Sequence, residues 1–535
     1  MNAAPRPRNP HKVSLKSVAE CAGVPATAGT VVDPRVVVTG VTLDSRAIRP
    51  GDLYAALPGA HVHGADFGVA AVGLGAIAIL TDPRGAALLA LKEIPVPVLV
   101  VPDPRASLGG VAAMIYDRAS EGLTMLGITG TNGKTTTAYV LDSALRALGR
   151  VTGLIGTVET RIGEERVKSV RTTPESADLH ALFAVMRERG VDTCTMEVSS
   201  HALSLHRVDG VRFDVVAFTN LSQDHLDFHG SMESYYLSKA SLFTPDRAVR
   251  GVVCVDDEWG QRLVRESEVP VVSVSSRPDV AADWQVQSSG VDGAAFELIG
   301  QEQRLSLRSA LPGDFNQLNT AVAALVLLAA GYAGDEIVQA LAADPHVPGR
   351  MERVLVDDNQ RVESAEPLAQ DRMPLAVVDF AHTPDAVAAA LKALRHNTSG
   401  SLIVVLGAGG DRDAGKREAM GAAAAAYADR VIVTDDNPRS EAPVDIRAAV
   451  LRGAVAQDRT VGRSPGRIIE IGDRGAAIRA AVVESGPGDT VVVLGKGHES
   501  GQEIAGVVHP FDDRAELRAA LIERAAADAN RGDAS

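Results

Sequence analysis

The stretch GITGTNGKTTT, residues 127–137, joins a predicted strand to a predicted helix and decides the central part of the fold. The apolar run LTML precedes it, and the helical pattern AYVLDSALRALG follows it. Glycines let successive backbone N–H groups turn toward an anion, and the helix adds the positive end of its dipole. Lys134 is placed to reach the terminal phosphates of a nucleotide, and the Thr135 hydroxyl to hold Mg²⁺. The stretch therefore predicts a phosphate-binding loop.

The glycine spacing of this loop departs from the common pattern. The pattern G-x-x-x-x-G-K-[ST] has glycine at the position of Ile128, whereas the glycines here fall at 127, 130 and 133. The sequence therefore indicates a phosphate loop of a particular variety.

Length and composition restrict the class of protein. With 535 residues, 46% hydrophobic and 23% charged, the chain predicts a globular protein of two to four domains. A net charge of −15 gives no electrostatic reason to expect nucleic acid or an anionic membrane as a partner. The longest apolar stretch, at residues 70–80, is too short to span a bilayer. We expect small-molecule substrates, no membrane insertion and a monomer.

The N-terminus and the cysteines indicate the compartment. Residues 1–12 lack the apolar core of a signal peptide and are predicted to be a disordered tail. Cys21, Cys194 and Cys254 show no paired spacing, which indicates a reducing compartment and no structural metal. The expected location is the cytoplasm.

The order of apolar runs predicts an α/β fold of three domains. Residues 13–122 alternate short apolar runs with turn residues and predict a small mixed α/β domain. Residues 123–347 alternate apolar strands with helical patterns, which is typical of a parallel sheet with crossover helices. Residues 348–535 repeat that alternation and predict a second, Rossmann-like doubly wound sheet.

Polar side chains gather where the central strands end. Glu197, Ser199 and Arg207 follow one strand, and His225 and Lys239 follow the next. Ligands of doubly wound sheets bind at the carboxyl ends of strands. A carboxylate and an imidazole beside a phosphate loop suit Mg²⁺ held by few protein ligands.

Long motifs along nearly the whole chain resemble the Mur ligase family. They are GITGTNGKTTT, MEVSSHAL, NLSQDHLDFHG, YYLSKASLF, GDFNQLNTAVA, PGRME, VVDFAHTPDA, GAGGDRDAGKR, TDDNPR and LGKGHE, together with LDSR at residues 43–46. The resemblance implies an ATP-dependent ligase of peptidoglycan precursor synthesis with a UDP-substrate domain, an ATPase domain and an amino-acid domain. It implies addition of the third peptide residue to UDP-N-acetylmuramoyl-L-alanyl-D-glutamate through an acyl phosphate, with ATP and Mg²⁺.

The resemblance also implies roles for individual residues. The ATP site is formed by Gly130, Thr131, Asn132, Gly133, Lys134, Thr135, Asn316, Asn319, Arg350 and Asp379. The UDP-muramyl dipeptide is bound by Leu43, Ser45, Thr172, Thr173, Ser199 and Arg207. The incoming amino acid is bound by Arg412, Asp436, Asn437, Pro438, Arg439, Gly495 and Glu499. Catalysis and metal binding involve Lys134, Thr135, Glu197, His225 and Lys239.

Two positions need comment. From the residues alone, Lys239 reads as a surface lysine of a helix; in the family the matching lysine is carbamylated by CO₂ and becomes a metal ligand. Relatives often carry glutamine where this chain has Leu205, which puts one substrate hydrogen bond in doubt.

The third residue is expected to be meso-diaminopimelate, and L-lysine is the alternative. The two amino acids differ by one carboxylate at the far end, and the planar fork of arginine binds a carboxylate bidentately. Arg439 in TDDNPR matches the arginine of family members that use diaminopimelate.

Three other functions are weighed against this reading. Folylpolyglutamate synthase shares the GTNGK loop, but LDSR and DNPR argue against it. A nucleotide-dependent switch or transport ATPase would not need an amino-acid pocket, and the chain has no N-K-x-D motif. A non-catalytic binding protein is disfavoured by the intact set of lysine, glutamate and histidine.

Overall fold

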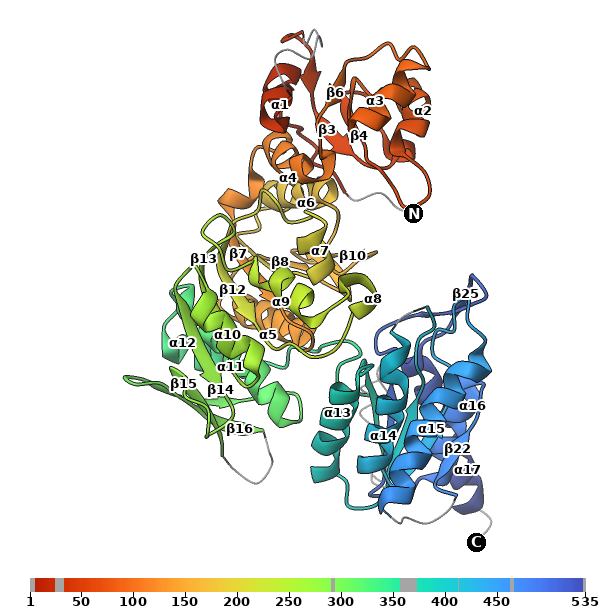
Figure 1. Ribbon diagram of the computed structural model, residues 1–535. Coiled ribbons are helices and arrows are strands. Elements are labelled where there is room, and N and C mark those ends of the chain that lie inside the picture. Colours follow the sequence, from red (N-terminus) through yellow and green to blue (C-terminus); the bar gives the residue numbers. More distant parts are fainter. Residues whose placement is uncertain are drawn as a thin grey trace.

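The computed structural model describes residues 5–24, 33–289, 294–356, 373–411, 413–461 and 466–532. The three largest sheets follow one another along the chain, in the red to orange, yellow to green and teal to blue parts of Figure 1. Helices pack on each of them, which confirms the predicted α/β class with three sheets in series.

The N-terminal part is built on a parallel four-stranded sheet in the order β3-β4-β5-β6. Strand β4 reads DLYAA and is buried along its whole length, as expected for a parallel strand covered on both faces. Helices α3 and α4 each begin with a capping aspartate followed by proline, which favours helix initiation. The elements are β1 (Val13–Ser14), α1 (Leu15–Ala22), β2 (Val37–Val38), β3 (Gly40–Thr42), η1 (Ser45–Ala47), β4 (Asp52–Ala56), η2 (Gly64–Phe67), α2 (Gly68–Gly73), β5 (Ala78–Thr81), α3 (Pro83–Ala90), β6 (Val98–Val100), α4 (Pro104–Ile115) and η3 (Ala119–Gly122).

Residues 5–12 pack against the rest of the chain, although the sequence predicts a disordered tail there. The Arg6 guanidinium donates to both carboxylate oxygens of Asp52, at 2.8 and 2.6 Å. The backbone N–H groups of Arg8 and Asn9 donate to the Glu188 carboxylate of the central part, at 2.9 and 2.8 Å. The segment therefore connects the N-terminal and central parts. The partner of Arg6, Asp52, lies 46 residues further along the chain, so the polar composition of residues 1–12 does not reveal this ion pair.

The central part holds an eleven-stranded sheet in the order β10-β9-β8-β11-β7-β12-β13-β14-β15-β16-β17. The seven central strands, in the order β8-β11-β7-β12-β13-β14-β15, are parallel to one another, and antiparallel strands close both edges. The elements are β7 (Thr124–Thr129), α5 (Lys134–Ala147), β8 (Thr152–Ile155), β9 (Glu159–Ile162), β10 (Glu165–Lys168), α6 (Ser176–Glu188), β11 (Thr193–Glu197), α7 (Ser200–Ser204), β12 (Phe213–Phe218), α8 (Leu226–His229), α9 (Met232–Ala240), β13 (Ala248–Cys254), α10 (Glu258–Glu266), β14 (Val271–Ser275), β15 (Trp284–Ser288), β16 (Ala295–Ile299), β17 (Arg304–Arg308), α11 (Asp314–Ala329) and α12 (Gly334–Ala340).

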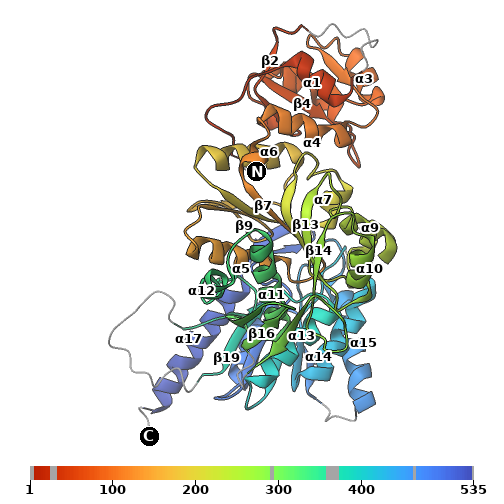
Figure 2. The same cartoon turned by 90° about the vertical axis from the view of Figure 1, so that its left-hand side faces the viewer.

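Strand β7 shows how this sheet is covered on both faces. Met125 belongs to the hydrophobic cluster under α6, whereas its neighbour Leu126 belongs to the cluster under α5 and α11. Successive residues of a strand point to opposite faces, so a strand buried on both sides is apolar throughout. Helices α4 and α6 lie side by side at the junction with the N-terminal part (Figure 2).

The C-terminal part has a six-stranded sheet in the order β18-β19-β23-β20-β21-β22, parallel except for β18. Side chains of α13, α14 and α15 cover one face, and those of α16 and α17 cover the other. The elements are β18 (Glu352–Arg353), β19 (Leu375–Asp379), α13 (Pro384–His396), β20 (Leu402–Leu406), η5 (Ala414–Lys416), α14 (Arg417–Tyr427), β21 (Arg430–Val433), α15 (Pro443–Val461), β22 (Ile468–Glu470), α16 (Arg474–Glu484), β23 (Thr490–Leu494), the hairpin of β24 (Gly501–Ile504) and β25 (Val507–Pro510), and α17 (Asp513–Gly532).

None of the helices in the described ranges combines the length and the apolar character needed to cross a membrane.

Candidate active site

The phosphate loop lies between β7 and α5, as the sequence predicts. Gly130 and Gly133 have φ angles of 145° and 86°, a backbone region that residues with a side chain rarely adopt. A Cβ at Gly133 would lie 2.4 Å from the Asn319 side-chain oxygen, so the loop and α11 can approach only because this residue is glycine. Lys134 is the first residue of α5, and the loop N–H groups lie at the positive end of that helix.

The Lys134 ammonium lies against its own loop. Its Nζ donates to the carbonyl oxygens of Gly130 and Thr131, both at 2.8 Å. Burial lowers the pKa of Lys134, while the charges of Glu197 and Asp224 raise it in part. A cation held at this position is available to neutralise a phosphate.

Glu197 is the centre of a cluster of oxygen atoms beside the loop. It ends β11 and is 1% exposed. Its carboxylate accepts hydrogen bonds from Thr135 Oγ1 at 3.0 Å, from the Thr157 N–H at 2.8 Å and from Thr157 Oγ1 at 3.0 Å. A carboxylate with a hydroxyl beside a phosphate loop fits Mg²⁺, which takes one or two protein carboxylates and completes its shell with phosphates and water.

The other two residues predicted for the metal site are Lys239 and His225. Lys239 is 1% exposed, and its Nζ donates to the Gly130 carbonyl at 2.7 Å and lies 4.6 Å from the centre of the Tyr235 ring. The His225 Nε2 lies 3.5 Å from Asp224, and burial lowers the pKa of this imidazole to about 3, so it is neutral at physiological pH. Within the described residues, no three His, Cys, Asp or Glu side chains gather in a metal-binding cluster.

Arg350 joins the phosphate loop to the C-terminal part. Its guanidinium donates to Thr135 Oγ1 at 3.3 Å and lies 4.2 Å from the centre of the Phe380 ring. Asp379 holds the same segment, because its carboxylate accepts from the N–H groups of Met351 and Ala381, both at 2.8 Å. Arg350 and Asp379, both predicted for the ATP site, therefore belong to segments that contact each other.

The predicted adenine-contacting pair lies on α11 behind the loop. Asn316 and Asn319 are both buried, and Asn319 Nδ2 donates to Asn316 Oδ1 at 3.1 Å. Asn316 Nδ2 donates to the Pro312 carbonyl at 2.7 Å. The position of Asn319 against Gly133 brings this pair to the phosphate loop.

Four of the six residues predicted to bind the UDP-muramyl dipeptide lie together. Thr172 contacts Thr157, which also contacts Glu197. Thr173 Oγ1 accepts from the Ser199 N–H at 3.1 Å, and Arg207 donates to the Thr173 carbonyl at 3.4 Å. Leu43 and Ser45 lie in the N-terminal part, and no hydrogen bond or ion pair in the described ranges joins them to this group.

The predicted amino-acid pocket is assembled at the ends of β21 and β23. Asn437 Nδ2 donates to Glu499 at 2.8 Å. A Cβ at Gly495 would lie 2.4 Å from an Asp436 carboxylate oxygen, so the two loops are in direct contact. The Pro438 carbonyl accepts from the Glu441 N–H at 3.1 Å and closes the turn. Arg412 lies outside the described residues.

The β24–β25 hairpin holds the backbone of Arg439. Arg439 has a left-handed φ of 53°, its N–H donates to the Glu503 carbonyl, and its carbonyl accepts from Ala505. Its side chain donates to the Gly410 carbonyl at 2.5 Å and lies 3.7 Å from the Glu503 carboxylate. The guanidinium is therefore held at the edge of the pocket.

Sequence reasoning missed Lys496, which lies beside three residues of this predicted pocket. Its side chain is fully buried, and its Nζ lies 3.0 Å from Asn437 Oδ1, 3.4 Å from Glu499 and 3.7 Å from Asp436. The motif LGKGHE contains this lysine, and a lysine directly after an apolar strand was the signal that could have found it.

Sequence reasoning also missed an ion cluster between the central and C-terminal parts. The Asp224 carboxylate lies 3.2 Å from Lys416 and 3.7 Å from His382, both residues of the C-terminal part. Burial alone would raise the pKa of Asp224, but the hydrogen bond and charges of His382, His225 and Lys416 lower it. The pairing depends on how two domains meet, which no local pattern encodes.

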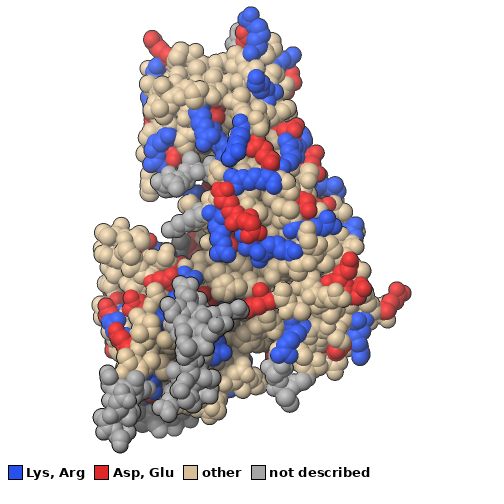
Figure 3. Space-filling view, turned by 180° about the vertical axis from the view of Figure 1, so that it is seen from behind, with Lys and Arg blue, Asp and Glu red and all other residues tan. Residues whose placement is uncertain are grey.

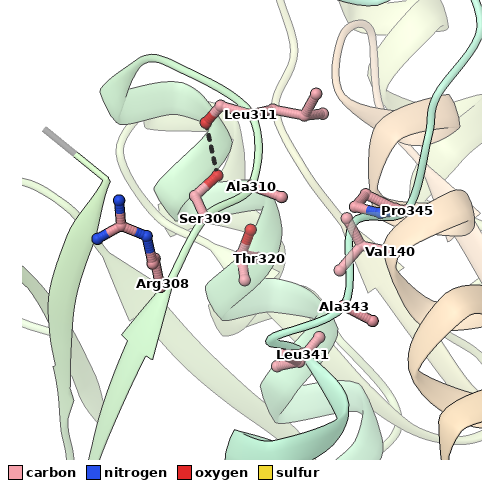
Figure 4. A pocket seen from close by; sticks show the side chains of 9 residues that line it. All are labelled: Val140, Arg308, Ser309, Ala310, Leu311, Thr320, Leu341, Ala343 and Pro345. Atoms are coloured by element: carbon pink, nitrogen blue, oxygen red, sulfur yellow. Dashed lines mark hydrogen bonds between the residues drawn. The ribbon is translucent and has the colours of Figure 1, made fainter. Parts of the chain in front are cut away.

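The surface is hollowed between the N-terminal part and the C-terminal part in the view from behind (Figure 3). Acidic and basic side chains are mixed on that face. A separate cavity between α5 and the end of β17, lined by Val140, Thr320 and Leu341 among others, measures about 10 Å³ (Figure 4). That volume suits no more than one water molecule, so this cavity is not a substrate site.

Comparisons with known proteins identify the family of this chain. The domain description "Mur ligase family, catalytic domain" matches residues 37–116, "Mur ligase middle domain" matches 128–327, and "Mur ligase, glutamate ligase domain" matches 349–497. The UDP-N-acetylmuramoyl-L-alanyl-D-glutamate--2,6-diaminopimelate ligase of Streptomyces avermitilis is 53% identical over 97% of this chain and 98% of its own. The protein of the same name from Corynebacterium glutamicum is 47% identical over 94% of each chain.

Solved structures show the same fold. A structure of a UDP-N-acetylmuramoyl-L-alanyl-D-glutamate--2,6-diaminopimelate ligase is 30% identical, covers 96% of this chain and 99% of its own, and has a TM-score of 0.64. A Mycobacterium tuberculosis folylpolyglutamate synthase, 19% identical, covers 72% of this chain and 91% of its own with a TM-score of 0.53, which indicates a shared fold alone. The matches along almost the whole chain confirm the resemblance read from the motifs, and the chain belongs to the Mur ligase family.

Proposed function

We propose that this chain is the ATP-dependent ligase that joins meso-diaminopimelate to the D-Glu side-chain carboxylate of UDP-N-acetylmuramoyl-L-alanyl-D-glutamate. The names of relatives 40–53% identical support the proposal. The observation that carries it is the position of Arg350, which contacts Thr135 of the phosphate loop and Phe380 of the C-terminal part. Arg350 thus joins the loop proposed to bind ATP to the part proposed to bind the amino acid.

The proposed ATP site consists of the phosphate loop, two asparagines of α11, and Arg350 and Asp379 near the loop. The loop N–H groups and Lys134 bind the phosphates, Asn316 and Asn319 contact the adenine, and Arg350 and Asp379 lie near the γ-phosphate and the ribose. Transfer of the γ-phosphoryl group to the D-Glu carboxylate gives an acyl phosphate and ADP. The amine of the incoming amino acid then displaces inorganic phosphate and forms the amide bond.

Mg²⁺ would be held by Thr135 and Glu197, with His225 near a second site, and it supplies charge neutralisation between two anions when bound. Lys134 contributes to the same neutralisation from the loop side. The buried carboxylate of Glu197, with hydroxyl oxygens at 3.0 Å, supports this assignment because Mg²⁺ prefers oxygen ligands.

Lys239 is proposed to carry a carbamate. Burial, reinforced by the charge of Lys134, lowers the pKa of Lys239 well below its usual value, although Asp224 raises it in part. The neutral amine is the form that reacts: its nitrogen bonds to the carbon of CO₂, and one proton is released. The resulting anion would suit a metal site where an ammonium would not.

The domain boundaries are proposed to lie at 122/123 and 347/348, because a new sheet begins after each of them. The UDP-muramyl dipeptide is proposed to contact Leu43, Ser45, Thr172, Thr173, Ser199 and Arg207. We further propose a monomer, and a location in the cytoplasm that the free cysteines at 21, 194 and 254 support.

The alternative functions differ in their acceptor substrates. Release of ADP is measured with UDP-N-acetylmuramoyl-L-alanyl-D-glutamate and either meso-diaminopimelate or L-lysine, and separately with a folate and L-glutamate. The proposal expects turnover with the first pair alone. Turnover with folate and glutamate, or no turnover with the UDP substrate, would overturn it.

A further inference from the structure

A single carboxylate lies between two arginines at the junction of the N-terminal and central parts. Glu175 is the residue before α6, and its side chain is 13% exposed. Its Oε2 accepts from Arg105 Nη1 at 3.0 Å, and its Oε1 lies 3.0 Å from Arg207 Nη2. Arg105 belongs to α4 of the N-terminal part, whereas Arg207 belongs to the central part. The junction therefore carries two guanidinium groups for one carboxylate.

These arginines lie among the residues proposed to bind the UDP substrate. Arg207 Nη1 donates to the Thr173 carbonyl at 3.4 Å. Arg105 Nη1 also donates to the carbonyl of Leu205, at 3.4 Å, which is the residue after the short helix α7 that Ser199 caps. Arg105 is thus a residue of the N-terminal part that reaches the proposed substrate-binding group of the central part.

The arrangement leaves positive charge and hydrogen-bond donors for a further partner. Arg207 is 12% exposed, and its Nε is buried without a hydrogen-bond partner. A buried N–H of a charged group that lacks an acceptor is destabilising, so such groups normally meet a partner in the functional state. Burial is the largest cause that lowers the pKa of Arg207. The positive charges of Arg171 and Arg105 lower it further, which shows that positive charge accumulates around this guanidinium.

We propose that Arg105 is a further substrate-binding residue, which forms an oxyanion-binding pair with Arg207 for a carboxylate or a phosphate of the UDP-muramyl dipeptide. Glu175 is the positioning residue that holds the two guanidinium groups together, since they would otherwise repel each other. The planar fork of arginine binds either oxyanion bidentately. This inference rests on the proposed function, because that function supplies the anionic substrate.

The same helix interface offers a matched control at its other end. Arg187, near the end of α6, donates to the Asp117 carboxylate just after α4, at 2.9 Å. This ion pair also joins the α4 region to α6, but its two side chains are about half exposed, and among the described residues no hydrogen bond or ion pair joins them to a predicted site residue. A variant at Arg187 therefore measures how the loss of an ion pair between α4 and α6 affects substrate binding when no proposed substrate contact is removed.

The test measures equilibrium binding of UDP-N-acetylmuramoyl-L-alanyl-D-glutamate to the full chain by isothermal titration calorimetry without ATP. Arg105→Ala should weaken binding by about 10- to 100-fold, the range expected when one charge-assisted hydrogen-bond partner is lost. Arg105→Lys should restore part of the affinity, and Arg187→Ala should stay within about twofold of the parent. If Arg105→Ala unfolds, Arg105→Gln, which keeps most of the stem, replaces it.

A second ligand distinguishes the two oxyanions. If UDP-N-acetylglucosamine, which carries the diphosphate but no carboxylate, loses as much affinity through Arg105→Ala, the bound group is a phosphate. If only the dipeptide-containing ligand loses affinity, the bound group is a carboxylate of the dipeptide. Either result supports the pair. Unchanged affinity of Arg105→Ala for both ligands, or an equal loss in Arg187→Ala, overturns it.

Glu175→Gln tests the positioning role. It should raise KM for the UDP substrate by about 5- to 20-fold, less than a direct contact, and leave KM for ATP unchanged. Glu175→Asp should recover part of the loss. Equal changes in both KM values would contradict positioning. A parent protein that does not bind the UDP substrate at all would refute the proposed function itself, whereas normal binding by both parent and Arg105→Ala refutes only this inference.

Discussion

The amine nitrogens of Lys134 and Lys239 both donate to the carbonyl oxygen of Gly130, at 2.8 and 2.7 Å. Burial lowers the pKa of each amine, and the charge of Lys134 lowers the pKa of Lys239 further. Two ammonium groups this close in a buried site repel each other, so the arrangement favours one cation and one neutral amine. Lys134 is the residue proposed to bind phosphate, which leaves Lys239 as the neutral amine.

The first prediction is that Lys239 takes up CO₂. With ¹³C-labelled bicarbonate, the parent protein should show a carbamate carbon signal in its NMR spectrum, and Lys239→Ala should lack it. Lys239→Ala should also lose almost all ligase activity, and short-chain carboxylic acids should restore part of it by replacing the carbamate. The idea fails if the signal is the same in both proteins.

The second prediction concerns Lys134, the lysine of the phosphate loop. Lys134→Ala should abolish ADP release, because no other cation of the loop neutralises the transferred phosphate. Binding of the UDP substrate should remain, since its proposed contacts lie at Thr172, Thr173, Ser199 and Arg207. Calorimetry and the ADP assay measure the two effects separately, and full ligase activity in this variant would contradict the assignment.

The third prediction concerns the contact between Asp224 and Lys416. Lys416→Ala removes a largely buried partner of Asp224 and weakens the contact between the central and C-terminal parts. We expect kcat to fall by about tenfold or more, because about 1.4 kcal/mol lost from this contact in the transition state is a tenfold change in rate. Binding of the UDP substrate should not change. Lys392→Ala is the control, because Lys392 lies over Tyr427 within the C-terminal part and, among the described residues, no hydrogen bond or ion pair joins it to the central part. A kcat equal to that of the control would argue against a role for this contact.

The fourth prediction is a pH dependence of stability that arises from His180. This residue of α6 is 1% exposed, and its Nε2 lies 3.0 Å from the Asp209 carbonyl. Burial lowers its pKa to about 4, and the charge of Arg118 adds to the effect, while the Asp209 carbonyl opposes it.

The unfolded chain, with an ordinary histidine pKa of about 6.5, binds this proton before the folded chain does. The contribution of His180 to the free energy of unfolding should therefore be constant above about pH 7 and fall by up to about 3 kcal/mol as the pH drops from 6.5 to 4. Urea unfolding of parent and His180→Gln at pH 7.5 and pH 5 measures the difference. Equal losses of stability in the two proteins would refute the prediction.

The sequence predicts the fold class and the phosphate loop because both depend on local patterns. The run from residue 123 to 147 contains a buried strand, glycines at positive φ and an amphipathic helix, and each of these features has its own signal. The motif resemblance adds residues such as Asn319 and Arg350, which the structure brings to the loop.

Contacts between domains could not be predicted in this way. The partners Asp224 and Lys416 are separated by 192 residues, and Arg105 and Glu175 by 70. The burial of Lys496 could not be predicted for another reason. A lysine is usually exposed, and this one is buried because three polar neighbours contact its amine. Arg6 belongs to a polar tail by composition, yet its ion pair with Asp52 places it inside the fold.

The fifth prediction, the choice of amino acid, is the central claim. The Arg439 guanidinium lies at the edge of the proposed pocket, 3.7 Å from Glu503, and its planar fork suits the distal carboxylate of meso-diaminopimelate. L-Lysine lacks that carboxylate and would leave the arginine without its substrate partner, which costs roughly 2–5 kcal/mol by analogy with truncated charge pairs. Arg439→Ala should reduce this preference far more than it reduces ATP binding.

The most direct measurement is kcat/KM of the unmodified protein for meso-diaminopimelate and for L-lysine, with UDP-N-acetylmuramoyl-L-alanyl-D-glutamate and ATP saturating. The account predicts a ratio of about 30 to several thousand in favour of meso-diaminopimelate. Comparable values for the two amino acids would contradict it.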